Sequence, residues 1–261
     1  MNRTRRHFLF FTSAVVLFAL LWWAMRDLPP FGHYRGPYGE IINQTTVYER
    51  HITDAVTAVN FDFRGFDTLG EESILFMSVI GVTMLLRRQR GEEQEEEDDS
   101  GKNGKERKKL YQAPEASEAM KAVTLGLVGP LVVYGLYIIA HGQLTPGGGF
   151  QGGVILATAP LLVYLAGDLK TFKKIVTHYL VEIGEAAGIF GFIAIGTFGL
   201  VSGKQFLQNV LPYGTTGSVL SGGTVPLLTL TTGLAVAGGM VSAIYAFLEQ
   251  TVETRMEGGN E

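Results

Sequence analysis

The chain reads His141-Gly-Gln-Leu-Thr-Pro-Gly-Gly-Gly-Phe-Gln-Gly-Gly153 between two apolar runs, Ala119–Ala140 and Val154–Ala166. Each run is long enough, or nearly so, to cross a bilayer. Five glycines and a proline stand where the second of these membrane helices should begin. Glycine leaves the backbone uncovered, and proline suits a helix start. Such backbone is tolerated at membrane depth only where protein or trapped water satisfies its polar groups. The stretch therefore predicts a helix start packed tightly against other membrane helices.

The same residues match a dinucleotide-binding pattern, Gly147-x-Gly149-x-x-Gly152. That pattern has chemical meaning only after a strand and within a βαβ unit, whereas both flanks here are predicted membrane spans. Close helix packing is the better interpretation, because glycines four residues apart let two helix backbones approach each other. The predicted helix-packing motif consists of Pro146, Gly147, Gly148, Gly149, Phe150, Gly152 and Gly153.

Apolar residues make up 46% of the chain and gather in six runs. Runs of roughly 18 or more such residues are typical of membrane spans. The sequence therefore predicts an all-α integral membrane protein with about six transmembrane helices, two in an N-terminal module and four in a C-terminal bundle. The predicted spans are His7–Met25, Glu71–Leu86, Ala119–Ala140, Phe150–Ala166, Tyr179–Ser202 and Thr224–Leu248.

Lysine and arginine are distributed unequally between the segments that connect these spans. They occur before the first span, between the second and third, and after the fourth, whereas the two short connections on the other side carry only Lys204. The positive-inside rule then places both termini in the cytoplasm.

The net charge of −4 says little about partners, because the acidic charge is unevenly distributed, with seven of the 25 acidic residues in one run, Glu92–Asp99. Basic residues follow over Lys102–Lys109, and a segment of this kind without apolar anchors stays solvated. We interpret it as a disordered cytoplasmic linker, with a docking role as the alternative. The chain has no cysteine, which excludes disulfides, thiolate catalysis, iron–sulfur clusters and cysteine-ligated zinc. We expect no cofactor, no metal site and no nucleic-acid partner.

Acidic and aromatic residues alternate immediately before the second span, in Asp62-Phe-Arg-Gly-Phe-Asp-Thr-Leu-Gly-Glu-Glu72. Asp67 or Thr68 could cap the following helix, with Glu71 completing a capping box. Acidic side chains in a first turn also suit the helix dipole. The alternative is that Asp67 or Glu71 lines a cation entry route at the outer surface.

Two further features are candidates for an ion route. Glu182 and Glu185 stand three residues apart near the cytoplasmic start of the fifth span, so they share one helix face. Carboxylates inside a span usually face a bundle interior or water. Alternatively, the two carboxylates lie near the membrane surface and form ion pairs with nearby lysines. His141 closes the third span and can titrate near physiological pH, although a lone histidine is more often a structural hydrogen-bonding group.

These motifs resemble two known families. The residues His141-Gly142 and Pro146–Gly153, at a span entrance, resemble the hallmark of the B subunit of multisubunit Mrp (Mnh) Na⁺/H⁺ antiporters. The stretch Asp62–Glu71 resembles a small E-type subunit of energy-converting membrane-bound hydrogenases. It also resembles the far C-terminal part of the large Mrp A subunit. The two modules are fused here, which departs from the usual short B subunit.

The resemblance implies a domain organisation, with an E-like two-span module over residues 1–89, the charged linker over 90–115, an MrpB-like four-span domain over 116–250 and a cytoplasmic tail over 251–261. It implies a non-catalytic subunit of a monovalent cation/proton antiporter in a prokaryotic plasma membrane, contributing to assembly and to the sodium route. The implied partners are the lipid bilayer, large A and D type proton-channel subunits and small C, E, F and G type subunits, with Na⁺ and H⁺ as transported ions.

Two other functions remain open at this point. Hydrogenase-type membrane arms carry the same two modules as separate chains, so the protein could be an ion-translocating subunit of a redox complex whose catalytic centres lie elsewhere. A free-standing secondary transporter is the third possibility, although the sequence has no evident inverted repeat.

Overall fold

The computed structural model describes residues 3–26, 36–86, 117–167 and 169–257, and all regular structure in these ranges is helical. The predicted linker, residues 90–115, lies outside them. The described chain divides into two compact units, residues 1–41 and 42–261. In the first unit, α1 (Arg3–Met25) contains the apolar stretch Phe10–Trp23. Its large side chains are exposed, as expected of a helix that faces lipid.

The second unit begins within α2 (Pro37–Arg50) and continues through a short helix α3 (Ala55–Ala58) into a π-helix, η1 (Val59–Phe63). The long helices that follow are α4 (Gly65–Leu85), α7 (Glu118–Ala140), α8 (Gly149–Ala166), α10 (His178–Val201) and α11 (Val225–Glu257), with the short α9 (Leu169–Ile175) between α8 and α10.

Five helices among the described residues are long and apolar enough to cross a membrane. With the shorter apolar stretch of α1, they confirm the predicted all-α membrane protein of about six spans. The helix α11 extends to Glu257, beyond the boundary at residue 250 that we predicted for the start of the tail.

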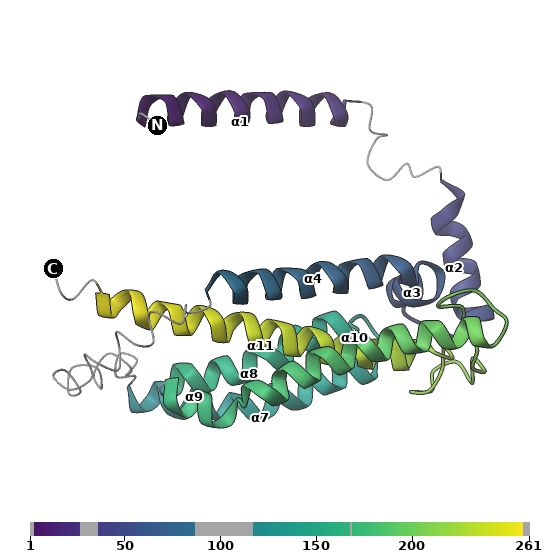
Figure 1. The fold of residues 1–261 in the computed structure, drawn as a ribbon. Coiled ribbons are helices and arrows are strands. Elements are labelled where there is room, and N and C mark those ends of the chain that lie inside the picture. Colours follow the sequence, from purple (N-terminus) through teal and green to yellow (C-terminus); the bar gives the residue numbers. More distant parts are fainter. Residues whose placement is uncertain (1–2, 27–35, 87–116, 168, 258–261) are drawn as a thin grey trace. The chain divides into compact units, whose positions relative to one another are not determined.

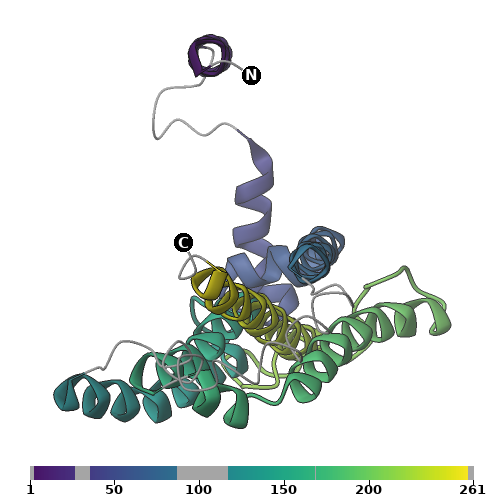
Figure 2. The same ribbon diagram turned by 60° about the vertical axis from the view of Figure 1, so that its left-hand side comes forward.

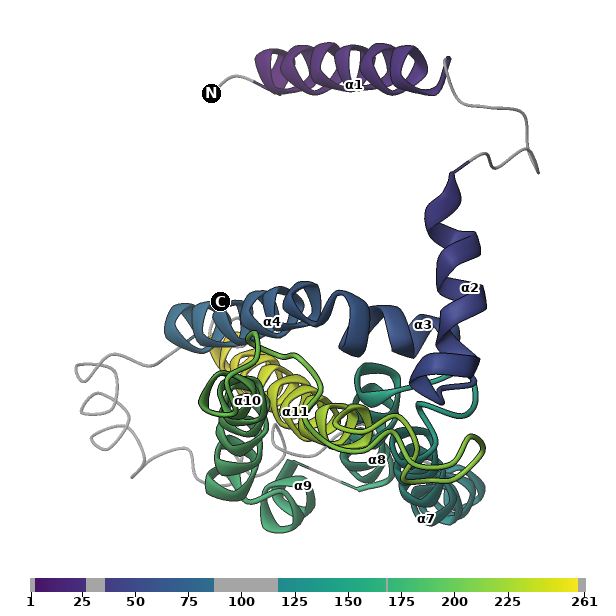
Figure 3. The same ribbon diagram turned by 90° about the vertical axis from the view of Figure 1, so that its right-hand side faces the viewer.

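The helix α11 is the centre of the second unit. It contacts α4, α7, α8, α10 and η1, and half of its membrane-spanning window is buried, against 17% for α4. Figure 1 shows it running alongside α4 and α10. In Figure 2 and Figure 3, α4 lies on one side of α11 and the helices α7, α8 and α10 lie on the other. Within the second unit, α4 therefore packs on the helices that follow it in the chain, through α11.

The glycine motif makes these close contacts. A methyl group at Gly149 would overlap the carbonyl of Thr229 on α11, and one at Gly153 would lie 2.8 Å from the Gly233 oxygen. Gly152 faces α7 instead, where a methyl group would lie 2.8 Å from the Gly135 oxygen. A side chain at any of these three glycines would push helix backbones apart.

The entry to α8 differs from the prediction in one respect. Pro146 lies in the preceding loop, three residues before the first helical residue, and is not in the first turn. Gly147 and Gly148 complete the turn with φ angles of 158° and 129°, in a region that residues with a side chain rarely adopt. Gly148 then stands as the residue before the helix.

The predicted capping box before α4 is wrong. The helix begins at Gly65, with Arg64 in the capping position and no side-chain hydrogen bond there. Thr68 lies inside the helix, and its hydroxyl donates to the carbonyl of Asn60 in η1 at 2.6 Å. The reason is tertiary packing: Phe61 in η1 is buried in a cluster with Phe192 and Leu207, and this anchor fixes where the π-helix ends and α4 starts.

Candidate functional site

A buried carboxylate occupies the contact between α4 and α11. Glu72 is 2% exposed, and its Oε1 accepts a hydrogen bond from the hydroxyl of Thr232 on α11. Its Oε2 is buried and has no hydrogen-bond partner within the described part of the chain. An unpartnered buried carboxylate is costly, and ionisable groups inside spans usually serve ion or proton movement.

A second buried carboxylate lies on α10, on another side of α11. Glu185 is 6% exposed and packs against Gly238 and Gly239, where a methyl group at Gly238 would lie 2.7 Å from the Glu185 nitrogen. Its Oε1 is also buried without a hydrogen-bond partner in the described ranges, while Ser242 on α11 interacts with the carboxyl group. The paired glycines therefore make the space that lets this carboxylate enter the helix interface.

The two carboxylates lie at different levels along α11. Thr232 and Gly239 mark these levels and are seven residues apart, about 10 Å along the axis at about 1.5 Å per residue. Val79 on α4 lies at the level of Glu185, since it is buried and 3.5 Å from the position of a methyl group on Gly239. The contacts of α11 with α4 and α10 thus hold two buried carboxylates at separate levels.

A cavity of about 460 Å³ opens next to the first carboxylate. Its walls come from α3, η1, α4, the start of α8 and α11, and Thr232 contributes to both the cavity wall and the hydrogen bond with Glu72. The other polar side chains that line it are Thr57, Asn60, Thr68, Glu71, Ser78 and Gln151.

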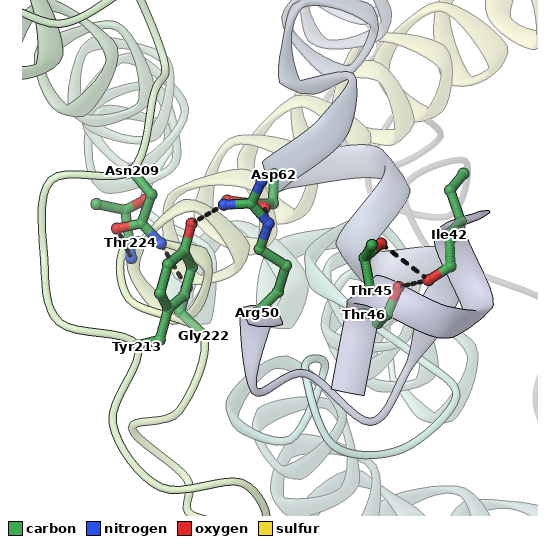
Figure 4. Close-up of polar contacts among 9 residues, drawn as sticks. All are labelled: Ile42, Thr45, Thr46, Arg50, Asp62, Asn209, Tyr213, Gly222 and Thr224. Atoms are coloured by element: carbon green, nitrogen blue, oxygen red, sulfur yellow. Dashed lines mark hydrogen bonds and ion pairs between the residues drawn. The ribbon is translucent and has the colours of Figure 1, made fainter. Parts of the chain in front are cut away.

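A separate polar cluster joins α2 and η1 to the loop before α11 (Figure 4). The Nε atom of Arg50 is 3.2 Å from Oδ2 of Asp62, and an Nη atom of Arg50 donates to the hydroxyl of Tyr213. The guanidinium also lies 5.5 Å from the ring centres of Phe63 and Tyr213. Burial raises the pKa of Asp62 above its ordinary value, and the nearby Arg50 offsets part of that rise. This cluster ties α2 and η1 to the loop before α11, outside the spans.

Gln143, in the loop after α7, connects the segment before α3 to the loop before α11 through hydrogen bonds. Its side chain is fully buried and donates to the carbonyl of Val219 at 2.5 Å, while its own backbone carbonyl accepts from the amides of Thr53 and Asp54. Three segments distant in sequence therefore meet at one residue. Sequence reasoning did not single it out, because its partners belong to distant segments.

The structure separates the residues that the sequence proposed for an ion route. Glu185 is buried, whereas Glu182 is exposed on the same helix. Asp67 is exposed and pairs with Arg64 at 2.5 Å, and Glu71 is an exposed residue on the cavity wall. His141 is half-buried, stacked on Tyr137 with its Nδ1 3.1 Å from the carbonyl of that residue. Within the described ranges, no three histidine or acidic residues converge as a metal site would require.

Glu72 is the buried carboxylate that the sequence interpretation passed over in favour of Glu71. A signal for it was present, since the buried residues of α4 are Gly65, Thr68, Glu72 and Val79. Their spacing of three, four and seven residues defines one helix face. With Thr68 as the capping residue, α4 was predicted to begin after Thr68, so that Gly65 and Thr68 were not recognised as part of its buried face.

Comparison with known proteins shows what the C-terminal part of the chain is similar to. Residues 119–242 match the family described as a domain related to the MnhB subunit of Na⁺/H⁺ antiporter. The uncharacterized protein MJ1307 of Methanocaldococcus jannaschii is 26% identical over 222 residues, which are 78% of this chain and 80% of that protein. The B subunit of the Na⁺/H⁺ antiporter of Alkalihalophilus pseudofirmus is 32% identical over 83 residues, 32% of this chain and 57% of that protein.

Two solved structures have a similar fold. One is a chain of the membrane-bound sulfane sulfur reductase, an archaeal respiratory membrane complex, with a TM-score of 0.71 and 29% identity over 93% of this chain and 98% of that chain. The other is a chain of the Mrp complex from a Dietzia species, with a TM-score of 0.67 over 94% of this chain and 26% of that chain. At 20% identity, the second likeness concerns the fold alone.

Proposed function

We propose that this chain, whose residues 119–242 form an MnhB-related domain, is a membrane subunit of a complex that exchanges Na⁺ for H⁺. The observation that carries the proposal is the position of Glu72. A carboxylate with an unpartnered oxygen in the described ranges is buried where α4 of the front module meets α11 of the MnhB-related domain. A carboxylate in such a place can take up a proton or a monovalent cation, and the site would be satisfied by either.

In this function the chain moves ions and carries out no chemical catalysis. Glu72 and Glu185 would serve as successive binding sites for a proton or Na⁺ along α11. The glycines of α8 would hold α7, α8 and α11 close together. This close packing would exclude water from both carboxylates, except along the route by which each one receives its ion.

The proposed partners are the other members of an Mrp-type antiporter complex, large A and D type and small C, E, F and G type subunits. Support comes from the match to antiporter B subunits and from the exposed apolar side chains that α4, α7 and α10 present away from α11. Such faces are covered by lipid or by other membrane helices.

Expression in an antiporter-deficient bacterium tests the proposal. The operon is introduced with and without this gene, and Na⁺/H⁺ exchange is measured in everted vesicles along with growth in high salt. We expect exchange and salt tolerance only when the gene is present. Unchanged exchange and unchanged salt tolerance in its absence would refute the proposed function.

A second function is favoured by the likeness to the sulfane sulfur reductase chain, which spans nearly the whole of that chain. Under this alternative, the protein is an ion-translocating subunit in the membrane arm of a redox complex. Affinity purification through this chain decides between the two. Co-purified iron–sulfur subunits with reductase activity would support the redox complex, and co-purified antiporter subunits alone would support the exchanger.

A further inference from the structure

The cavity beside Glu72 lies within the second unit and is shaped by several segments of the chain. Asn60 and Phe61 in η1 form one wall, Ser78 on α4 and Gln151 on α8 contribute two others, and Thr232 on α11 completes the lining. At about 30 Å³ for each water molecule, its volume of about 460 Å³ holds on the order of ten waters. A hydrated monovalent cation would therefore fit within this volume.

The lining of the cavity is suited to cations. It carries hydroxyl and amide oxygens and one carboxylate, Glu71, and the described residues that form it include no lysine or arginine. A cleft lined by charge of one sign concentrates the opposite ion. Oxygen ligands are also those that hard cations prefer.

The cavity leads to the buried carboxylate through one residue. Thr232 lines the cavity and donates its hydroxyl hydrogen to Oε1 of Glu72. Glu72 itself is 2% exposed, and its Oε2 lacks a hydrogen-bond partner within the described ranges. Thr232 thus connects the cavity wall to the carboxylate group of Glu72.

We propose that this cavity is a water-filled vestibule through which a monovalent cation reaches Glu72, with Glu71 on its wall as the attracting charge. The inference rests on the proposed function, because it supplies the access route to the ion-binding site of that function. The apolar residues Ile74, Leu75 and Phe150 form the rest of the wall.

The absence of cysteine in this chain permits a direct test with single-cysteine variants of the assembled complex. Ser78→Cys and Gln151→Cys place a thiol on two walls of the cavity, and Met77→Cys places one on an exposed position of α4 outside the lining. Each variant is treated with a cationic and with an anionic methanethiosulfonate of similar size. The mass shift of this chain gives the rate, which is normalised to the rate of the same reagent with a free thiol.

We expect both cavity thiols to react and the cationic reagent to be favoured by about tenfold or more. Met77→Cys should react much more slowly, because its exposed position within the apolar span of α4 faces lipid, which charged reagents do not enter. Adding Glu71→Gln should reduce the preference severalfold. Cavity thiols that react no faster than Met77→Cys, or that show no preference for the cation, would overturn the inference. Labelling does not depend on transport. If selective labelling is found while removal of the gene leaves exchange unchanged, the proposed function fails and the vestibule stands.

Discussion

The hydroxyl of Thr232 on α11 donates a hydrogen bond to Oε1 of Glu72 on α4. This bond joins two parts of the chain that lie 160 residues apart, at a level where the other carboxylate oxygen is buried without a partner in the described ranges. It therefore links α4 to the central helix α11, at the proposed ion-binding site.

Thr232→Val should reduce Na⁺/H⁺ exchange about tenfold, because a hydrogen bond to a charged group contributes about 1.5–3 kcal/mol and Val keeps the shape of the side chain. Thr229→Val is the matched control. Thr229 is also fully buried on α11, but its hydroxyl donates to the Val225 carbonyl of its own helix. Exchange is measured in everted vesicles and divided by the amount of assembled complex. Equal losses in the two variants would show a packing effect and not a role of the Glu72 hydrogen bond.

Glu185→Gln should lower exchange strongly while the complex still assembles, because Gln keeps the shape but cannot titrate. Glu182→Gln, three residues earlier on the same helix and exposed, should change it much less, since an exposed charge contributes at most about 1 kcal/mol. Vesicle assays across pH, together with native gels, measure both effects. If the two variants behaved alike, the burial of Glu185 would have no functional meaning.

Gly149→Ala and Gly152→Ala should disrupt assembly before they alter ion selectivity. The added methyl group would overlap the Thr229 carbonyl in the first variant and the Gly135 carbonyl in the second, and overpacking costs about 1–3 kcal/mol. Gly126→Ala on α7 is the control, because nothing lies within 4 Å of the added methyl group. Native gels of detergent-solubilised membranes report assembly. A fully assembled complex with altered selectivity would contradict the packing role.

Asp62→Asn should flatten the dependence of stability on pH. Burial raises the pKa of Asp62 in the folded protein, so this group contributes stability below its ordinary pKa of 3.8, and the contribution is lost as pH rises through the raised value. The wild-type protein should therefore lose more stability than the variant as pH rises above about 4. Thermal unfolding of the purified protein at a series of pH values gives the difference. A steeper loss in the variant would contradict the assignment.

The spans and the packing glycines could be predicted because they depend on local properties of the sequence. Apolar runs of sufficient length predict membrane helices, and the run of glycines before Phe150 predicted a close-packed helix start at a position where α8 does begin, Gly149. The π-helix could not be predicted in this way. Val59–Phe63 adopts it where Phe61 is buried against Phe192, and that contact depends on the folded arrangement.

The candidate site was predicted only in part, for the same reason. Glu185 could be proposed because a carboxylate within an apolar run is conspicuous. Glu72 stood next to Glu71 at the edge of a run, and only the helix register, fixed by the start at Gly65, decides which of the two is buried. The Arg50–Tyr213 hydrogen bond joins residues 163 positions apart, and no local pattern predicts such a pair.

The most direct test of the account is Na⁺-dependent proton movement in everted vesicles that carry the complex with Glu72→Gln. Glu118→Gln serves as the control, since it removes the same charge from an exposed position at the start of α7. Native gels establish that both variants assemble in wild-type amounts. We expect Glu72→Gln to lower the exchange rate by at least about tenfold, because Gln cannot bind and release a proton. The Glu118→Gln complex should exchange at nearly the wild-type rate. A normal exchange rate in the fully assembled Glu72→Gln complex would contradict the claim that this carboxylate carries the transported ion.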